Sequence, residues 1–182
     1  MSQAALDALT ARFPGAILRT HSQHGDDTAL IDPARNVEVL AFLRDSPDLL
    51  FNQLIDLTCF DTLGLDDRSI AAVGGSSKAG DPTSRRFHVV YHLRSLSTGK
   101  RLRVKAAVDE GPAGENPEID SVTSLWKAAF WAEREAWDMY GVRFRGHPDL
   151  RRLLLYEEFI GHPLRKDYPK EQRQPLFRRD FS

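Results

Sequence analysis

The sequence predicts an α+β domain with a mixed or antiparallel sheet, helices packed on one face of that sheet, and a long extended C-terminal arm. Residues 87–108 alternate apolar and polar side chains as an antiparallel hairpin does, and other segments repeat apolar residues at helical spacing. Residues 142–182 are rich in proline and charge and cannot form a core of their own. We therefore expect a domain over residues 1–141 and a docking arm over residues 142–182.

The distribution of charge indicates that the arm contacts a partner. The chain has 182 residues, of which 28% are charged, and a formal net charge of -1, so no global attraction to nucleic acid is expected. From Val142 onward there are ten Lys and Arg against six Asp and Glu, a net charge of +4, which leaves -5 for the first 141 residues. A basic arm on an acidic body is typical of a docking segment.

Cysteine and hydropathy limit the cofactors and the location. Cys59 is the only cysteine, so the chain cannot form an internal disulfide, an iron–sulfur cluster or a cysteine zinc site. The N-terminus lacks the pattern of a secretory signal, and nowhere do about 18 apolar residues run together. We expect a reducing compartment and no direct membrane span.

The N-terminal half is expected to contain two helices and three strands. Apolar residues recur at helical spacing in two segments, the second of which begins near Pro33. Two short strands flank a polar turn, and a third strand ends near Asp61. The predicted helices cover residues 3–13 and 34–46, and the predicted strands cover residues 16–22, 27–32 and 54–60.

The middle of the chain combines a loop with the hairpin. Residues 62–85 lose periodicity, and their glycine- and serine-rich composition predicts a flexible, exposed loop. In the hairpin that follows, Arg101, Arg103 and Lys105 alternate with apolar residues, which predicts a solvated basic face. A nucleic-acid-binding module that uses this face is an alternative, although no aromatic residues are interleaved with these arginines.

The next helix carries the candidate chemistry. Ser121 or Ser124 can cap a helix that runs to about Tyr140, and Glu133 lies in the middle of its apolar face. A carboxylate there is costly to bury unless it meets a cation or several donors. One interpretation is that Glu133 receives Arg151 or Arg152 and so pins the arm to the helix.

A second interpretation is an acid/base site formed by Glu133 and Asp138. No nucleophile, histidine or glycine-rich loop lies at suitable spacing beside these carboxylates, which favours the structural interpretation. Arg134 and Asp138, four residues apart, can pair on the flank of the helix, and Glu135 points away from the apolar stripe.

His147 and His162 each lie in a Gly-His-Pro sequence. They are 15 residues apart without a cysteine nearby, so a metal site is a weaker interpretation than two turns. Neither a P-loop nor a dinucleotide-binding glycine motif occurs. The residues alone predict a chain without an active site of its own.

Residues 133–154 closely resemble the signature of the C subunit of the proton-pumping NADH:quinone oxidoreductase, that is, respiratory complex I or type I NADH dehydrogenase. The segment GHPLRKDYP, residues 161–169, is similar to the C-terminal stretch of the same family. Every fixed position of the signature is present, namely Glu133, Arg134, Glu135, Asp138, Met139, Tyr140, His147, Arg151, Leu153 and Leu154.

The resemblance implies a non-catalytic, peripheral subunit on the cytoplasmic side of the cell inner membrane that supports electron transfer from NADH to quinone. No cofactor is expected in this chain, whereas flavin and iron–sulfur clusters are expected in its partners, chiefly the quinone-site subunit and its iron–sulfur neighbours. An equivalent subunit of a membrane-bound hydrogenase or of another donor-driven quinone reductase is the alternative. The residues expected to dock or pin the arm are Glu133, Arg134, Glu135, Asp138, His147, Arg151, Arg152, His162 and Arg165.

Overall fold

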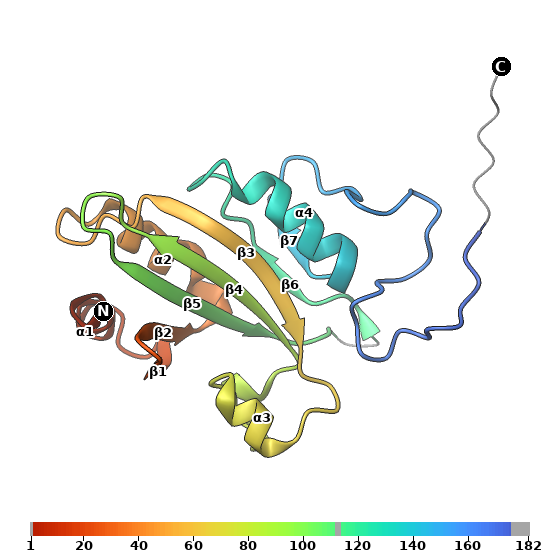
Figure 1. Ribbon diagram of the computed structural model, residues 1–182, viewed down its shortest axis with the longest axis horizontal. Coiled ribbons are helices and arrows are strands. Elements are labelled where there is room, and N and C mark those ends of the chain that lie inside the picture. The colour runs from red at the N-terminus through yellow and green to blue at the C-terminus, as the bar shows by residue number, and fades with distance from the viewer. Residues whose placement is uncertain (1, 112–113, 176–182) are drawn as a thin grey trace.

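The computed structural model describes residues 2–111 and 114–175, which form an α+β unit around one mixed sheet (Figure 1). The strand order is β1-β2-β5-β4-β3, antiparallel except for the pair β2 and β5, and β6 and β7 form a separate parallel pair. The elements are α1 (Gln3–Arg12), β1 (Ile17–Gln23), β2 (Asp26–Ile31), the 3-10 helix η1 (Pro33–Arg35), α2 (Asn36–Asp45), β3 (Gln53–Asp61), α3 (Asp67–Ala72), the 3-10 helix η2 (Pro82–Ser84), β4 (Phe87–Arg94), β5 (Arg101–Val108), β6 (Glu118–Asp120), α4 (Ala129–Tyr140) and β7 (Arg143–Arg145).

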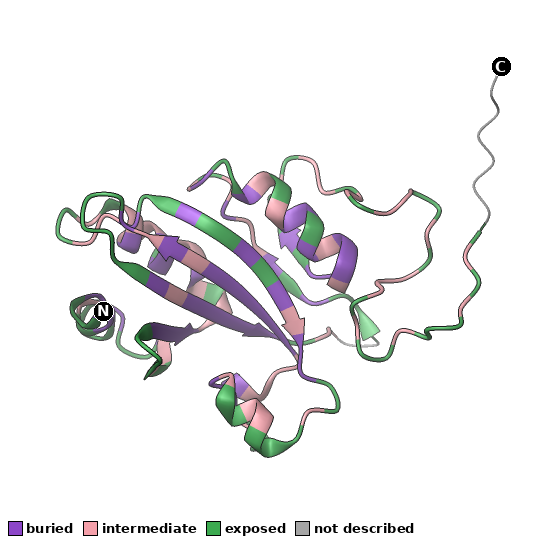
Figure 2. Ribbon diagram, viewed as in Figure 1, coloured by how far each residue is buried: buried purple, intermediate pink, exposed green. Residues whose placement is uncertain are grey.

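The core lies between the sheet and the helices α1, α2 and α4. Alternation places Val89, Tyr91 and Leu93 of β4 on the inner face, where each is at most 1% exposed. Leu40 of α2 and Ala136 of α4 belong to the same cluster. The predicted hairpin, the two flanking N-terminal helices and the first three strands are therefore confirmed, and Figure 2 shows their buried positions facing inward.

Residues 62–85 are not a simple loop, because they contain α3 and η2. Asp66 caps α3 by accepting a hydrogen bond from Ser69 N at 2.9 Å. The end of α3 is held by the sheet, since Lys105 Nζ donates to Val73 O at 2.6 Å and Arg19 Nη1 donates to Gly75 O at 2.8 Å. The segment is too short for its periodicity to be recognised in the sequence.

This segment also corrects the expected solvated basic face of the hairpin. Lys105 is only 6% exposed, and burial lowers its pKa to about 8. His88 is fully buried and stacks on Phe60 with ring centroids 4.7 Å apart. The second face of the hairpin is therefore covered near Lys105 and accessible only toward Arg101 and Arg103.

α4 begins at Ala129, later than the predicted cap at Ser121 or Ser124, and ends at Tyr140 as predicted. The Ser121 hydroxyl is hydrogen-bonded to Glu133 at 2.7 Å, so it is not available to cap a helix directly after it. Turns therefore connect Ser121 to the start of α4.

The folded body continues beyond the boundary expected at Gly141. β7 pairs with β6, and Val142 and Phe144 are at most 2% exposed in the core. Residues 146–175, here called the C-terminal segment, contain no helix or strand and lie beside α4 (Figure 1). A long extended arm is not evident in this segment, and residues 176–182 of the predicted arm lie outside the described residues.

Candidate functional site

Asp138 of α4 holds the backbone of the C-terminal segment. Its Oδ2 atom accepts hydrogen bonds from the consecutive amides of Leu153, Leu154 and Leu155 at 3.0, 2.8 and 3.0 Å. Its Oδ1 atom accepts from Arg152 Nη1 at 2.7 Å, and the Asp138 side chain is fully buried. Burial opposes ionisation, but the hydrogen bonds from Leu155, Arg152 and the other two amides outweigh it and hold the pKa of Asp138 below its ordinary value.

Two arginines hold carbonyl groups of the same segment. Arg134 donates through Nε to Arg151 O at 3.0 Å and through Nη2 to Arg152 O at 2.8 Å. Arg152 donates through Nη2 to Phe159 O at 2.7 Å and to Gly161 O at 3.1 Å. The predicted pair between Arg134 and Asp138 is wrong, because both side chains bind the C-terminal segment instead.

The last carbonyl groups of α4 are bound by the C-terminal segment. A helix leaves these carbonyls without intrahelical partners and favours cations near them. Burial, with the neighbouring arginines, lowers the pKa of His162, so its neutral ring donates through Nδ1. The donors are His162 Nδ1 to Asp138 O at 3.0 Å, Leu164 N to Met139 O at 3.0 Å and Arg165 Nε to Tyr140 O at 2.6 Å.

Gly141 makes this arrangement possible. Its φ of 76° ends α4 in the left-handed region. A Cβ atom at this position would lie 2.6 Å from both Arg165 Nη2 and His162 Cδ2. Both the backbone conformation and the close approach of the segment therefore require glycine.

His147 fastens the start of the segment to the other end of α4. Its Nε2 donates to Phe130 O at 3.0 Å, and its Nδ1 accepts from Asp149 N at 3.0 Å. Both ring nitrogens are thus engaged by the backbone, which leaves neither for a metal ion. No group of three or more His, Cys, Asp or Glu side chains arranged to hold a metal occurs in the part of the chain that the structure describes.

Glu133 is fully buried but does not bind the C-terminal segment. Its Oε2 accepts from Ser121 Oγ and its Oε1 from Val122 N, both at 2.7 Å. The expected ion pair with Arg151 or Arg152 is wrong, because Arg152 pairs with Asp138 and Arg151 pairs with Asp149. Burial raises the pKa of Glu133 to about 7.

A second attachment point for the segment lies at the end of β3. Arg86 Nη2 lies 2.7 Å from carboxylate oxygens of both Asp61 and Asp167, and Asp61 Oδ2 accepts from Lys166 N at 2.9 Å. Arg165 Nη1 donates to Glu110 at 3.0 Å in the same network. Reasoning from the sequence missed this network, because no periodic signal indicates a contact between residues this far apart.

Glu135 and Arg151 differ from the other predicted site residues. Both are exposed, and Arg151 is ion-paired with Asp149 at the surface. The structure therefore gathers Arg134, Asp138, His147, Arg152, His162 and Arg165 between α4 and the C-terminal segment, whereas Glu133 faces the turn at Ser121.

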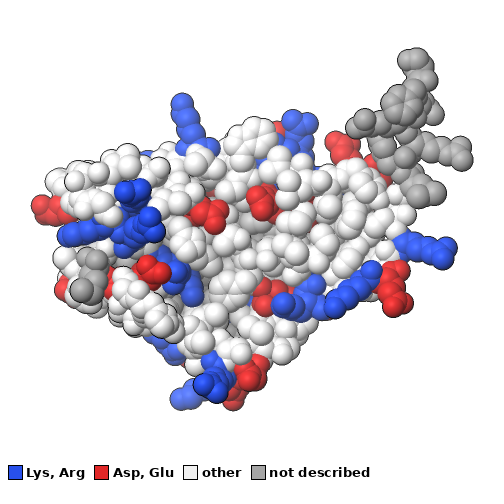
Figure 3. Space-filling model, in the orientation of Figure 1, with Lys and Arg blue, Asp and Glu red and all other residues white. Residues whose placement is uncertain are grey.

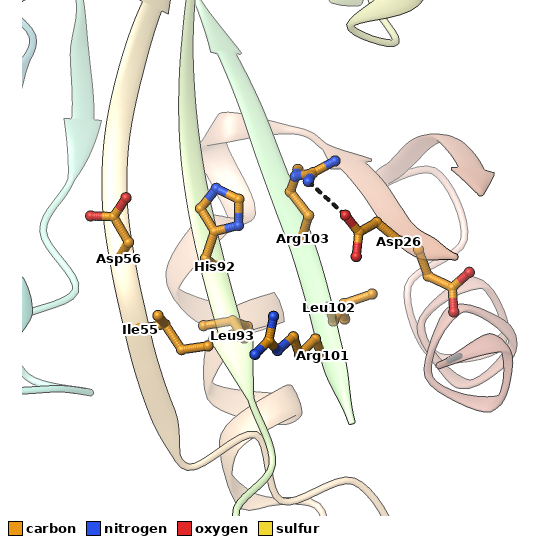
Figure 4. A pocket seen from close by; sticks show the side chains of 9 residues that line it. Asp26, Ile55, Asp56, His92, Leu93, Arg101, Leu102 and Arg103 are labelled. Carbon is orange, nitrogen blue, oxygen red and sulfur yellow. Dashed lines mark hydrogen bonds and ion pairs between the residues drawn. The ribbon is translucent and has the colours of Figure 1, made fainter. Parts of the chain in front are cut away.

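A groove on the outer face of the sheet is a different kind of surface (Figure 4). Arg103 pairs with Asp26 at 3.3 Å, and Asp56 and His92 are cross-strand neighbours. Acidic and basic side chains are mixed across this view of the molecule (Figure 3), which does not favour a track for a phosphate backbone. The groove has a volume of about 400 Å³ and is lined by Asp26, Asp27, Ile55, Asp56, His92, Leu93, Arg101, Leu102 and Arg103.

We predict that Asp138→Asn frees the C-terminal segment. The amide leaves Arg152 without its buried anion, which should lower the free energy of opening the segment by about 3–5 kcal/mol. Asp149→Asn is the matched control, because it removes a surface ion pair worth about 1 kcal/mol or less. The rate of tryptic cleavage within residues 146–175 measures the effect, and equal rates for the two variants would contradict the assignment.

We also predict that Glu133 makes the chain less stable as the pH rises from about 4.5 to 7. In that window folded Glu133 keeps a proton that the unfolded chain has lost, so stability decreases with rising pH, by about 3 kcal/mol for this raised pKa. Glu133→Gln should remove this dependence, whereas Glu135→Gln, at an exposed neighbour, should retain it. Urea denaturation at pH 5 and pH 7.5 tests the prediction, and identical pH profiles for all three proteins would refute it.

None of the helices in residues 2–111 and 114–175 has the length and apolarity needed to cross a bilayer. By fold, the chain is similar to one in an archaeal respiratory membrane complex, the membrane-bound sulfane sulfur reductase. That similarity has a TM-score of 0.58 at 16% identity and covers 85% of this chain and 76% of the other. At this identity the likeness concerns the fold alone.

Sequence comparisons identify closer relatives. The NADH-quinone oxidoreductase C subunit of Citrifermentans bemidjiense is 41% identical over 92% of this chain and 90% of its own length. The protein of the same name from Roseiflexus sp. is 42% identical over 94% and 86%, respectively. A second form of this protein, from Rhizobium etli, is 42% identical over 87% and 72%.

Residues 29–174 match the family described as respiratory-chain NADH dehydrogenase, 30 Kd subunit. The match includes the signature residues of α4 and nearly all of the C-terminal segment, so the resemblance found in the sequence is confirmed. The chain belongs to this family and is a peripheral, non-catalytic subunit of NADH:quinone oxidoreductase.

Proposed function

We propose that the C-terminal segment docks this chain onto the quinone-site subunit and its iron–sulfur neighbours, on the cytoplasmic side of the inner membrane. The observation that carries the proposal is the outward side of the segment. Leu154, Ile160 and Leu164 are 61%, 55% and 49% exposed, although the backbone beneath them is pinned to α4. Exposed apolar side chains on a fixed backbone are typical of a protein–protein interface.

Contacts within the segment support this role, because they fix its shape before any partner binds. Gln174 accepts from Ile160 N at 2.8 Å and donates to Ile160 O at 3.0 Å, which closes a loop. Tyr156 Oη donates to Pro175 O at 2.8 Å, and the rings of Phe159 and Tyr168 stack 6.2 Å apart. A preformed surface lowers the entropy that association costs.

The proposed contribution to electron transfer is positional. The geometry described above supplies hydrogen-bond clips and apolar surface, and the family assignment supplies the enzyme in which they act. By holding the quinone-site subunit and the cluster-bearing subunits together, the chain would keep the electron path from NADH to quinone intact. The flavin and the clusters themselves belong, in this proposal, to the partners.

We predict that the triple variant Leu154→Ser, Ile160→Ser and Leu164→Ser folds normally but assembles poorly. Recovery of the quinone-site subunit with the tagged chain should decrease at least about tenfold, because the central apolar contacts of an interface dominate its affinity. NADH-to-quinone activity in the purified fraction should decrease in parallel.

The matched control is Leu63→Ser with Leu96→Ser, two exposed apolar residues of the body at 45% and 61% exposure. This variant should assemble like the wild type. Equal recovery from the triple variant and the control would overturn the docking role of the C-terminal segment.

A further inference from the structure

A second apolar surface lies at the N-terminal end of α4. It is a groove of about 530 Å³, here called the Trp131 groove, with Phe130, Trp131 and Pro148 on its apolar side and Thr123, Ser124 and Lys127 on its polar side. Trp131 is 57% exposed, whereas Trp126 nearby in the sequence is only 6% exposed. The body of the chain thus leaves a large aromatic side chain uncovered beside a cavity.

The aromatic side of the groove is held in place by its neighbours. Trp131 meets Phe130 edge to face at 5.3 Å, and the His147 ring packs on Phe130 at 5.0 Å. The Arg134 guanidinium lies 5.1 Å from the Trp131 ring. An exposed aromatic side chain that is already ordered loses little entropy on binding and is the kind of residue that dominates interface energies.

The groove is also electropositive. Lys127 lies at its rim, and none of the described residues that line it is Asp or Glu. Arg134 is 5% exposed and binds two carbonyl groups, but no carboxylate in residues 2–111 and 114–175 forms an ion pair with it. A buried guanidinium without a carboxylate and an ammonium group at the rim together favour an anionic partner.

We propose that the Trp131 groove receives a segment of another subunit in which an apolar side chain stands next to an aspartate or glutamate. The apolar side chain would pack on Trp131 and Pro148, and the carboxylate would approach Lys127. The inference rests on the proposed assembly function and adds to it a second contact, separate from the surface of Leu154, Ile160 and Leu164.

The test is site-specific photocrosslinking in the assembled complex. A p-benzoylphenylalanine replaces Trp131 in the full chain, the complex is purified and irradiated, and the crosslinked peptide is identified by mass spectrometry. The expected product is a peptide of another subunit with an apolar residue adjacent to Asp or Glu. The absence of a crosslink, a crosslink to a second copy of this chain, or a peptide without an acid would overturn the proposal.

The same probe at Leu154 and at Leu96 separates this inference from the docking role of the C-terminal segment. A crosslink from position 154 but none from position 131 would overturn the groove and leave the docking segment standing. A crosslink from position 131 but none from position 154 would do the reverse. Position 96, exposed on the hairpin turn, gives the background.

Charge reversal provides a second measurement that does not alter Trp131. Lys127→Glu should weaken retention of the chain in the complex by about tenfold or more during a moderate salt wash, because like charges then face each other. Lys127→Arg should retain the chain as the wild type does. Equal retention of Lys127→Glu and Lys127→Arg would overturn the role of the carboxylate.

Discussion

The C-terminal segment depends on one buried carboxylate, that of Asp138. A stretch of 30 residues without helix or strand must find partners for its backbone polar groups outside a ladder. Asp138 binds three successive amides and one guanidinium, and that guanidinium in turn binds the carbonyls of Phe159 and Gly161. A single α4 side chain thereby organises residues 152–161.

The rest of the fold positions α4 so that this carboxylate is available. The inner face of the sheet buries Ala129 and Ala136 of α4, and the fully buried Glu133 ties the helix to the turn at Ser121 and Val122. Gly141 then ends the helix with a left-handed residue that the segment can approach closely. The Asp61–Arg86–Asp167 network fixes the segment again, where it passes the end of β3.

Much of the fold was predictable because its elements have clear periodicity. The hairpin alternates strictly, and α1 and α2 have apolar faces bounded by proline or a polar turn. β6, β7 and α3 were missed because three to six residues are too few to show a period. Within the site, the buried acids and the arginines of the segment were recognisable, but their partners were not. Only the path of the chain before α4 brings Ser121 and Val122 to Glu133 and so leaves the arginine to Asp138.

The hydrogen bonds of Asp138 imply that the C-terminal segment is ordered on α4 before the complex assembles. Amide hydrogen exchange of Leu153, Leu154 and Leu155 in the isolated chain tests this most directly. Hydrogen bonding to Asp138 predicts exchange at least about a hundredfold slower than that of unprotected amides. Exchange at the unprotected rate, while the amides of the β4–β5 hairpin remain protected, would contradict this order and make the segment dependent on its partner.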